Sequence, residues 1–369
     1  MNSRQGKHFN VRWLRSALLV WLTATGACSA WATGVTVITH GWALVPGTYP
    51  SWVDQMAQAV TNVAYRKGLA SSMYHITYSG DIVSGYTRSI ANVSTLTAAN
   101  SDEVVVTVDW SVLANNLDAF NNAGITTEDI ARWLAQDLLT LYPQQGLTTP
   151  LASRPIHLIG HSRGGSVMLE TAKFLGSSGI WVDQVTTLDP HPLAFPDFGV
   201  MPGSGDPAVH LYENVVFADN YWRANFAPFD FDGQSIPGSE DVNLNDDILV
   251  ADGYTVAHQN VHAWYHGTIG FGSTFPTSDG TVSIPDDWYV LPNPARNLSG
   301  FLYSRLASGT LRDRPAFSYA TGSRFGGHHV REINSRDGGA QWANIGFIHT
   351  PAYPANRLPQ GSDLAVTYK

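Results

Sequence analysis

Short apolar runs rich in β-branched residues alternate with longer amphipathic segments along most of this chain. The apolar runs predict buried strands at residues 34–39, 73–78, 103–110, 155–160, 182–188 and 214–218. Several of the intervening segments repeat apolar residues every three or four positions, which is the period of a helix. Because strands that alternate with helices favour a mostly parallel sheet covered on both faces, the pattern predicts an α/β fold.

Two of the predicted helices have recognisable beginnings. The first is expected to begin at Ser51, with Asp54 completing a capping box, and to end at Gly68. The second is expected to begin at Thr126 or Thr127. Their inner faces are predicted to be Val53, Met56, Val60 and Val63 in the first helix, and Ile130, Leu134, Leu138 and Leu141 in the second.

The character of the sequence changes after about residue 270. Glycine, proline and small polar residues become frequent there, and no long apolar stripe of helical period is visible. We therefore expect one α/β domain over residues 33–272. A loop- and strand-rich extension over residues 273–369 is expected to pack on it.

The N-terminus has the layout of an export signal. Four positive residues precede a short apolar run at residues 17–22, and Ala30-Trp31-Ala32 is an A-x-A cleavage site. The run is far shorter than the ~20 residues of a membrane-spanning helix. We expect residues 1–32 to be a signal peptide removed before Thr33, which predicts a secreted or periplasmic protein. A lipoprotein signal that ends at Cys28 is the alternative.

Composition excludes several classes of protein. Hydrophobic residues make up 44% of the chain and charged residues 14%, which excludes disorder for most of it. With 21 basic and 30 acidic residues and no basic run, no nucleic-acid partner is expected. Cys28 is the only cysteine, so a disulfide scaffold and a cysteine-ligated metal site are excluded. Neither a metal nor another cofactor is expected.

One motif carries a candidate nucleophile. Gly160-His161-Ser162-Arg163-Gly164 fits G-x-S-x-G, and it lies between a predicted strand and a predicted helix that runs to about Gly176. A sharp strand-to-helix turn of this type exposes the serine Oγ, and the flanking glycines let strand and helix approach closely. Ser162 is therefore the candidate nucleophile of a serine hydrolase.

Such a serine needs a base and an acid that orients the base, which follow it in the order acid, then histidine. Asp189 and Asp219 each follow a predicted strand, and the fold alone does not choose between them. His258, His262 and His266 recur at four-residue spacing, but evenly spaced histidines on one helix do not converge on one metal ion. His258 opens this segment after a loop and is the candidate base, with His262 as the alternative.

The oxyanion of the reaction needs two preorganised N–H donors. We expect one from the backbone of Arg163, which follows the nucleophile, and one from the backbone of Trp42, in the turn after the first strand. Gly41 permits that turn. His40 is interpreted as a residue that supports the turn through hydrogen bonds.

Four short pieces occur in order along the chain: His40-Gly41, Val108-Asp109-Trp110, Ile159-Gly160-His161-Ser162 and Leu188-Asp189-Pro190. Together they resemble the α/β-hydrolase fold and, within it, the pancreatic-type (lipoprotein-lipase-like) lipases, over about residues 34–270. The resemblance implies that the acid is Asp189 and the base His258. The chain departs from this family at Arg163, where an apolar residue is usual, in the length of residues 68–102, and in lacking cysteines for a bridged lid.

These observations together predict a secreted serine hydrolase that cleaves carboxylic esters, as a lipase or an esterase does. Its expected partners are a small-molecule or lipid ester and, transiently, a lipid surface. A peptidase or amidase on the same triad is the alternative, because both reactions pass through an acyl-enzyme. A non-catalytic binding protein on the same fold is a third reading, and it would be expected to lack a member of the triad.

Overall fold

The computed structural model describes most residues between 34 and 307. Its gaps are residues 44, 82–84, 98–99, 115–124, 179, 181, 193–205, 213, 224–232, 245–248, 250–253, 271–273, 291–295, 297–298 and 305. The predicted export signal, its cleavage site and residues 308–369 lie outside the described residues. Within the described part of the chain, no helix is long and apolar enough to cross a membrane.

An eight-stranded sheet forms the centre of the described fold. Its strands lie in the order β3-β2-β4-β1-β5-β6-β7-β8. The β2–β3 pair is antiparallel, and every other neighbouring pair is parallel. The strands are β1 (Val35–Thr39), β2 (Leu69–Asp81), β3 (Gly85–Leu96), β4 (Asn100–Asp109), β5 (Ile156–His161), β6 (Val182–Leu188), β7 (Val215–Trp222) and β8 (Glu240–Asn243).

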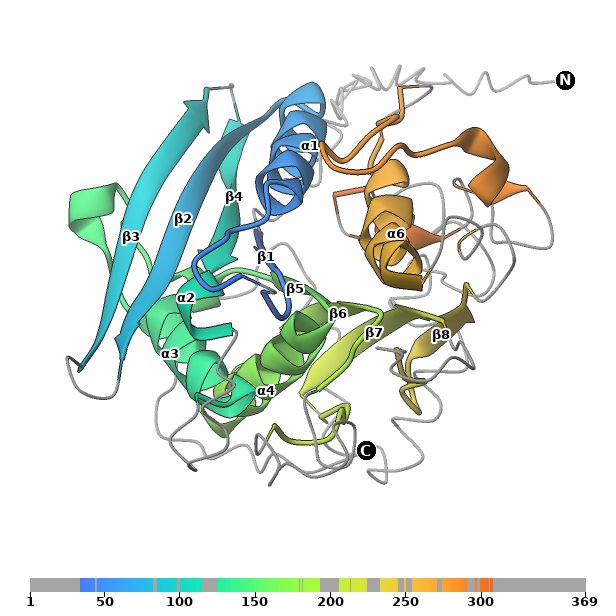
Figure 1. Cartoon of the computed structure of the whole chain (residues 1–369). Coiled ribbons are helices and arrows are strands. Elements are labelled where there is room, and N and C mark those ends of the chain that lie inside the picture. Colours follow the sequence, from blue (N-terminus) through green and yellow to red (C-terminus); the bar gives the residue numbers. More distant parts are fainter. Residues whose placement is uncertain are drawn as a thin grey trace, which may run out of the picture. The chain divides into compact units, whose positions relative to one another are not determined.

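Helices cover both faces of this sheet (Figure 1). Ile38 and Ile159 share one apolar core with α1 and α6, whereas Val37 and Leu158 share the other with α3 and α4. Successive side chains of a strand point to opposite faces, so the central strands are apolar on both. The helices are α1 (Trp52–Arg66), α2 (Ser111–Ala114), α3 (Thr127–Leu139), α4 (Arg163–Ser177) and α6 (Tyr254–Gly267), with 3₁₀ turns η2 (Pro143–Gln145), η3 (Leu151–Ser153), η4 (Asp286–Tyr289) and η5 (Gly300–Tyr303).

The centre of the sheet gives the fold its class. β5 lies between β1 and β6 and leads through a single residue, Ser162, into α4. A mostly parallel sheet with helices on both faces and this strand–turn–helix at its centre is the α/β-hydrolase fold. The predicted fold class is therefore confirmed.

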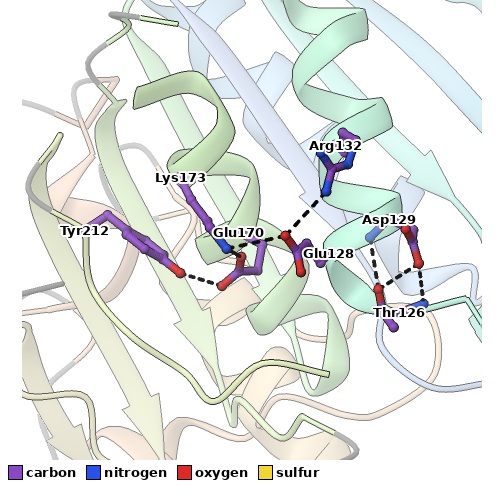
Figure 2. A network of polar contacts seen from close by, with 7 residues as sticks. All are labelled: Thr126, Glu128, Asp129, Arg132, Glu170, Lys173 and Tyr212. Carbon is purple, nitrogen blue, oxygen red and sulfur yellow. Dashed lines mark hydrogen bonds and ion pairs between the residues drawn. The ribbon is translucent and has the colours of Figure 1, made fainter. Parts of the chain in front are cut away.

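Of the two helix beginnings expected from the sequence, the structure shows a side-chain cap at the second and none at the first. Ser51 precedes α1 with φ −62° and ψ −21° and makes no side-chain cap, while Asp54 accepts a 2.8 Å hydrogen bond from the Tyr49 hydroxyl. The capping box predicted there is wrong, because an N-cap residue needs extended backbone. Thr126 has that backbone, with φ −87° and ψ 164°, and it caps α3 in a reciprocal pair with Asp129 (Figure 2).

Charged side chains connect α3 with α4, the helix that follows the candidate nucleophile (Figure 2). Lys173 Nζ lies 2.9 Å from Glu170 Oε2 on its own helix and 3.5 Å from Glu128 Oε1 on α3. The Tyr212 hydroxyl donates to Glu170 at 2.6 Å. Arg132 Nη2 lies 3.4 Å from Glu128, and these two side chains are too exposed for their ion pair to stabilise the fold strongly.

Several boundaries differ from the sequence-based expectation. α3 ends at Leu139, so Leu141 lies beyond the helix and is 47% exposed instead of lining its inner face. β3 and β8 had not been predicted, because β3 is mostly exposed and polar and β8 has only four residues. β7 continues to Trp222, so Asp219 lies within this strand and not after it.

The described part of the predicted extension consists of loops, η4, η5 and an isolated bridge between Ser278 and Ser283. Its side chains Trp288, Tyr289 and Phe301 are buried in the same core as α1 and α6. The domain boundary expected after residue 272 stays a prediction.

Candidate active site

Ser162 occupies a strained turn between β5 and α4. Its φ of 56° and ψ of −129° are unusual for a residue with a side chain, and its N–H donates to the Leu188 carbonyl at 2.8 Å. A Cβ on Gly160 would lie 2.2 Å from the Gly164 carbonyl oxygen, and one on Gly164 would lie 2.3 Å from the His40 carbonyl oxygen. Only glycine fits at these two positions, which is what a nucleophile elbow requires.

Asp189 lies in the turn directly after β6, also with a positive φ, of 49°. Its N–H donates to the Tyr221 carbonyl at 2.7 Å. The carboxylate is fully buried, and its Oδ1 accepts hydrogen bonds from the backbone N–H groups of Arg223, at 2.9 Å, and Gly233, at 3.1 Å. Such donors stabilise the ionised form of a buried carboxyl group.

His258 lies on α6 and contacts this carboxylate. Its Nδ1 is 2.6 Å from Asp189 Oδ2. The preceding residue of the elbow, His161, donates from Nε2 to the His258 carbonyl at 3.0 Å, and the two imidazole rings are 4.5 Å apart. His258 therefore lies beside His161, the residue that precedes Ser162 in the chain, and its ring is held by Asp189. Burial lowers the pKa of His258 well below its ordinary value, and the positive charge of Arg223 lowers it further.

The other two histidines of α6 have different partners. His262 Nδ1 lies 2.8 Å from Asp279 Oδ2, and both side chains are fully buried. His262 also stacks on Trp52, with ring centroids 4.1 Å apart. Burial lowers the pKa of His266 to about 4. His262, the alternative base, thus pairs with a carboxylate other than Asp189. Within the described residues no group of three or more His, Cys, Asp or Glu side chains is arranged to hold a metal ion.

Asp219, the alternative acid, points into the sheet interior. Its Oδ1 accepts hydrogen bonds from Gln184 Nε2, at 2.9 Å, and from Thr186 Oγ1, at 2.7 Å. Burial raises the pKa of Asp219 to about 7, and the two donors oppose that shift. The structure brings Asp189, and not Asp219, into contact with an imidazole of α6.

The turn expected to supply an oxyanion donor lies against the elbow. A Cβ on Gly41 would lie 2.5 Å from Ser162 Cβ and 2.9 Å from the backbone nitrogen of Arg163. His40 supports this turn as interpreted from the sequence: its Nδ1 donates to the Gly41 carbonyl at 2.8 Å, and its Nε2 accepts from the Trp110 N–H at 3.3 Å. The neighbouring N–H of Trp42 stays the predicted second donor.

The side chain of Arg163 explains why the position after Ser162 is not apolar. Its guanidinium is buried and forms two hydrogen bonds with Asp206, from Nε at 2.6 Å and from Nη2 at 2.8 Å. It also donates to the carbonyls of Ala114 and Ile125, at 3.0 and 2.9 Å. These contacts anchor the Arg163 side chain to α2 and to the segment that leads into α3. The backbone N–H of Arg163 is the expected oxyanion donor.

Sequence reasoning missed three residues around the site: Asp206, Arg223 and Gly233. All three belong to loops far from Ser162 in the sequence, and none belongs to a recognisable motif. The unusual arginine at position 163 was the one available signal, because a buried guanidinium requires an acidic partner somewhere in the chain.

No protein-family model matches the chain, and no curated protein matches it. Similar solved structures include a gene product of Listeria innocua, with 12% identity and a TM-score of 0.31 over 62% of this chain and 78% of that one. A protein from Lactobacillus plantarum provisionally named a cell surface hydrolase has 14% identity and a TM-score of 0.28, over 53% and 68% of the two chains.

A protein from Xanthomonas campestris, provisionally named a hydrolase of the α/β superfamily, has 14% identity and a TM-score of 0.25. This match covers 62% of this chain and 96% of that one. At such TM-scores the likenesses carry no argument. The fold assignment therefore rests on the sheet and on the turn at Ser162.

Proposed function

We propose that this chain is a secreted serine hydrolase that cleaves carboxylic esters, with Ser162 as nucleophile, His258 as base and Asp189 as the acid that orients the base. The observation that supports this proposal most directly is the 2.6 Å contact between His258 Nδ1 and Asp189 Oδ2. Asp189 directly follows Leu188, whose carbonyl accepts the N–H of the strained Ser162. A nucleophile elbow, a histidine next to it and a buried carboxylate behind that histidine form the constellation of acyl transfer.

In the first half of the reaction, Ser162 Oγ attacks the ester carbonyl carbon while its proton passes to His258 Nε2. The carbonyl π electrons move to oxygen, and the N–H groups of Arg163 and Trp42 stabilise the resulting oxyanion. The carbonyl then re-forms and the bond to the alcohol oxygen breaks. The alcohol leaves with the proton from His258.

In the second half, water replaces the alcohol. Its oxygen attacks the acyl carbon, and His258 takes its proton. When the tetrahedral intermediate collapses, Ser162 regains a proton and the carboxylic acid is released. Throughout both halves Asp189 keeps Nδ1 of His258 protonated and stabilises the imidazolium.

The position of the acid also favours a pancreatic-type arrangement. Asp189 follows β6, which is the strand directly after the nucleophile strand β5 in the chain. The sequence has no cysteine after Cys28, so the bridged lid of those lipases has no counterpart here. We therefore propose an ester substrate, in solution or at a lipid surface, without assigning its acyl chain.

The test replaces the nucleophile. Ser162→Ala is expected to abolish hydrolysis of p-nitrophenyl esters of graded acyl length, leaving at most the ~10³–10⁴-fold catalysis over water that an oxyanion hole and substrate binding provide. Ser166→Ala is the matched control, because Ser166 lies one turn further along α4, is buried, and its Oγ has no partner among the described residues.

Circular dichroism of both variants checks that they are folded. Wild-type rates in a folded Ser162→Ala variant would overturn the proposal. Faster cleavage of a matched p-nitroanilide than of the ester would replace ester hydrolysis by the amidase alternative while leaving Ser162 in place.

A further inference from the structure

A positively charged side chain lies behind the candidate acid. Arg223 directly follows the last residue of β7, and its side chain is completely buried. Its Nε lies 3.4 Å from Asp189 Oδ2, and its backbone N–H donates to Asp189 Oδ1 at 2.9 Å. Arg223 therefore contacts both oxygens of this one carboxylate.

The imidazole shares that carboxylate with the guanidinium. His258 Nδ1 lies 2.6 Å from the same Oδ2, so Arg223 Nε and His258 Nδ1 are about 6 Å apart at most. An arginine is protonated at all pH values that proteins tolerate. The single negative charge of Asp189 is thus already balanced by Arg223 before His258 takes up a proton.

This balance changes what the acid does for the base. A carboxylate alone stabilises the imidazolium and so favours protonation of the histidine. A fixed cation on the same oxygen opposes that effect. The other titratable groups described around His258 are His161, from β5, His191, after β6, and His262, from α6. Burial and the charge of Arg223 both lower the pKa of His258, so the ring is neutral at pH values where a free histidine is charged.

We propose that Arg223 is a positioning residue that acts through Asp189: it holds the carboxylate toward His258 and keeps the base neutral, so that the hydrolase works in mildly acidic solution. The inference rests on the proposed function. It concerns the pH dependence of the site, which neither the triad nor the fold determines.

The experiment follows the reaction of Ser162 with a fluorophosphonate probe as a function of pH, from about pH 4 to about pH 9. The rate requires a neutral base, so its acid limb reports the protonation of His258. In the Arg223→Gln variant we expect this limb to move to higher pH by about one pH unit or more. Arg223→Lys keeps the charge and is expected to restore most of the wild-type profile.

The matched control is Arg88→Gln. Arg88 also pairs with a buried aspartate, since its Nη1 lies 2.8 Å from Asp137 Oδ1, but it belongs to β3, at the far edge of the sheet from β7. Its removal is expected to leave the limb unchanged. A merely structural role for Arg223 would lower the amount of reactive protein without moving the limb.

Each outcome has one meaning. A limb that stays in place in a folded Arg223→Gln variant overturns the inference and leaves the proposed function intact. If that variant does not fold, the wild-type limb decides: a midpoint at or above the ordinary histidine value of 6.5 overturns the inference. If wild-type Ser162 does not react at any pH, the proposed function fails and the inference fails with it.

Discussion

The turn after β6 and the middle of β7 each bury one aspartate completely, yet the two carboxyl groups have different partners. Asp189 accepts two backbone N–H hydrogen bonds and contacts a histidine and an arginine. Asp219 accepts hydrogen bonds from the neutral side chains of Gln184 and Thr186, and burial raises its pKa to about 7. Asp189 follows β6 and Asp219 lies in the adjacent strand β7, and both are fully buried, so depth in the protein does not explain the difference.

Backbone geometry explains it. A side chain within a strand lies against side chains of the neighbouring strands on the same face of the sheet. For Asp219 these are a hydroxyl and an amide of β6. A residue in the turn beyond the strand instead meets backbone N–H groups of the next loop, and these stabilise an anion. In this structure the turn at the carboxyl end of β6 therefore offers Asp189 backbone donors that the interior of β7 does not offer Asp219.

The largest expected effect is a difference in kcat between variants of the two aspartates. Asp189→Asn keeps the shape of the side chain but no longer fixes the tautomer of His258, so we expect kcat to fall by about 10⁴. Asp219→Asn is expected to keep turnover close to wild type. Steady-state hydrolysis of a p-nitrophenyl ester measures both, and the reverse pattern would place the acid at Asp219.

The second effect concerns stability. Because the pKa of Asp219 is raised from 3.8 to about 7, the folded protein keeps a proton that the unfolded chain releases between these values. Stability contributed by this proton is complete below about pH 4 and is lost as pH rises to about 7, by about 1.4 kcal/mol per pH unit. The Asp219→Asn variant does not undergo this pH-dependent loss of stability, because asparagine does not titrate.

Urea unfolding at several pH values measures that difference. We expect Asp219→Asn and wild type to have similar free energies of unfolding near pH 4, and the variant to be the more stable one above pH 7. A constant difference between the two proteins across this range would show that folding does not raise the pKa of Asp219.

The smallest expected effect tests the hydrogen bond between Gly233 and Asp189. A Cβ on Gly233 would lie 2.2 Å from Asp189 Oδ1, so Gly233→Ala must displace the carboxylate. We expect a loss of about 1–3 kcal/mol of stability together with reduced kcat. Gly238→Ala is the control: its φ of 90° costs an alanine about 1–2 kcal/mol, but its neighbour is Leu211 and turnover should not change. Equal kcat in both variants would contradict the role given to the Gly233 N–H.

Local motifs allowed the sequence to predict the centre of the site. The elbow at Ser162 and the Leu-Asp-Pro turn at Asp189 are each contained in a few consecutive residues, and the strands before them are continuous apolar runs. His258 was also predicted, although it was expected to open its segment, whereas α6 begins four residues earlier, at Tyr254.

The rest depends on contacts across the fold. The strand expected at residues 214–218 placed Asp219 after its end, but β7 continues through Asp219 and Asn220. Thr186 and Thr187 of β6 hydrogen-bond to the side chains of these two residues. The buried arginines find their partners only in the folded chain: Arg163 with Asp206, and Arg223 with Asp189. No period or spacing in the sequence indicates such pairs.

The contact between His262 and Asp279 bears on where this protein can be truncated. Asp279 belongs to the segment expected to lie outside the catalytic domain, yet it reaches a helix that also carries the candidate base. Its Oδ1 accepts hydrogen bonds from the N–H groups of Thr281 and Val282, so the loop that carries Asp279 also orients its carboxylate. A gene shortened to residue 272 would leave a buried imidazole without the carboxylate that it contacts. Any segment cut out to fold by itself around α6 must therefore include this loop.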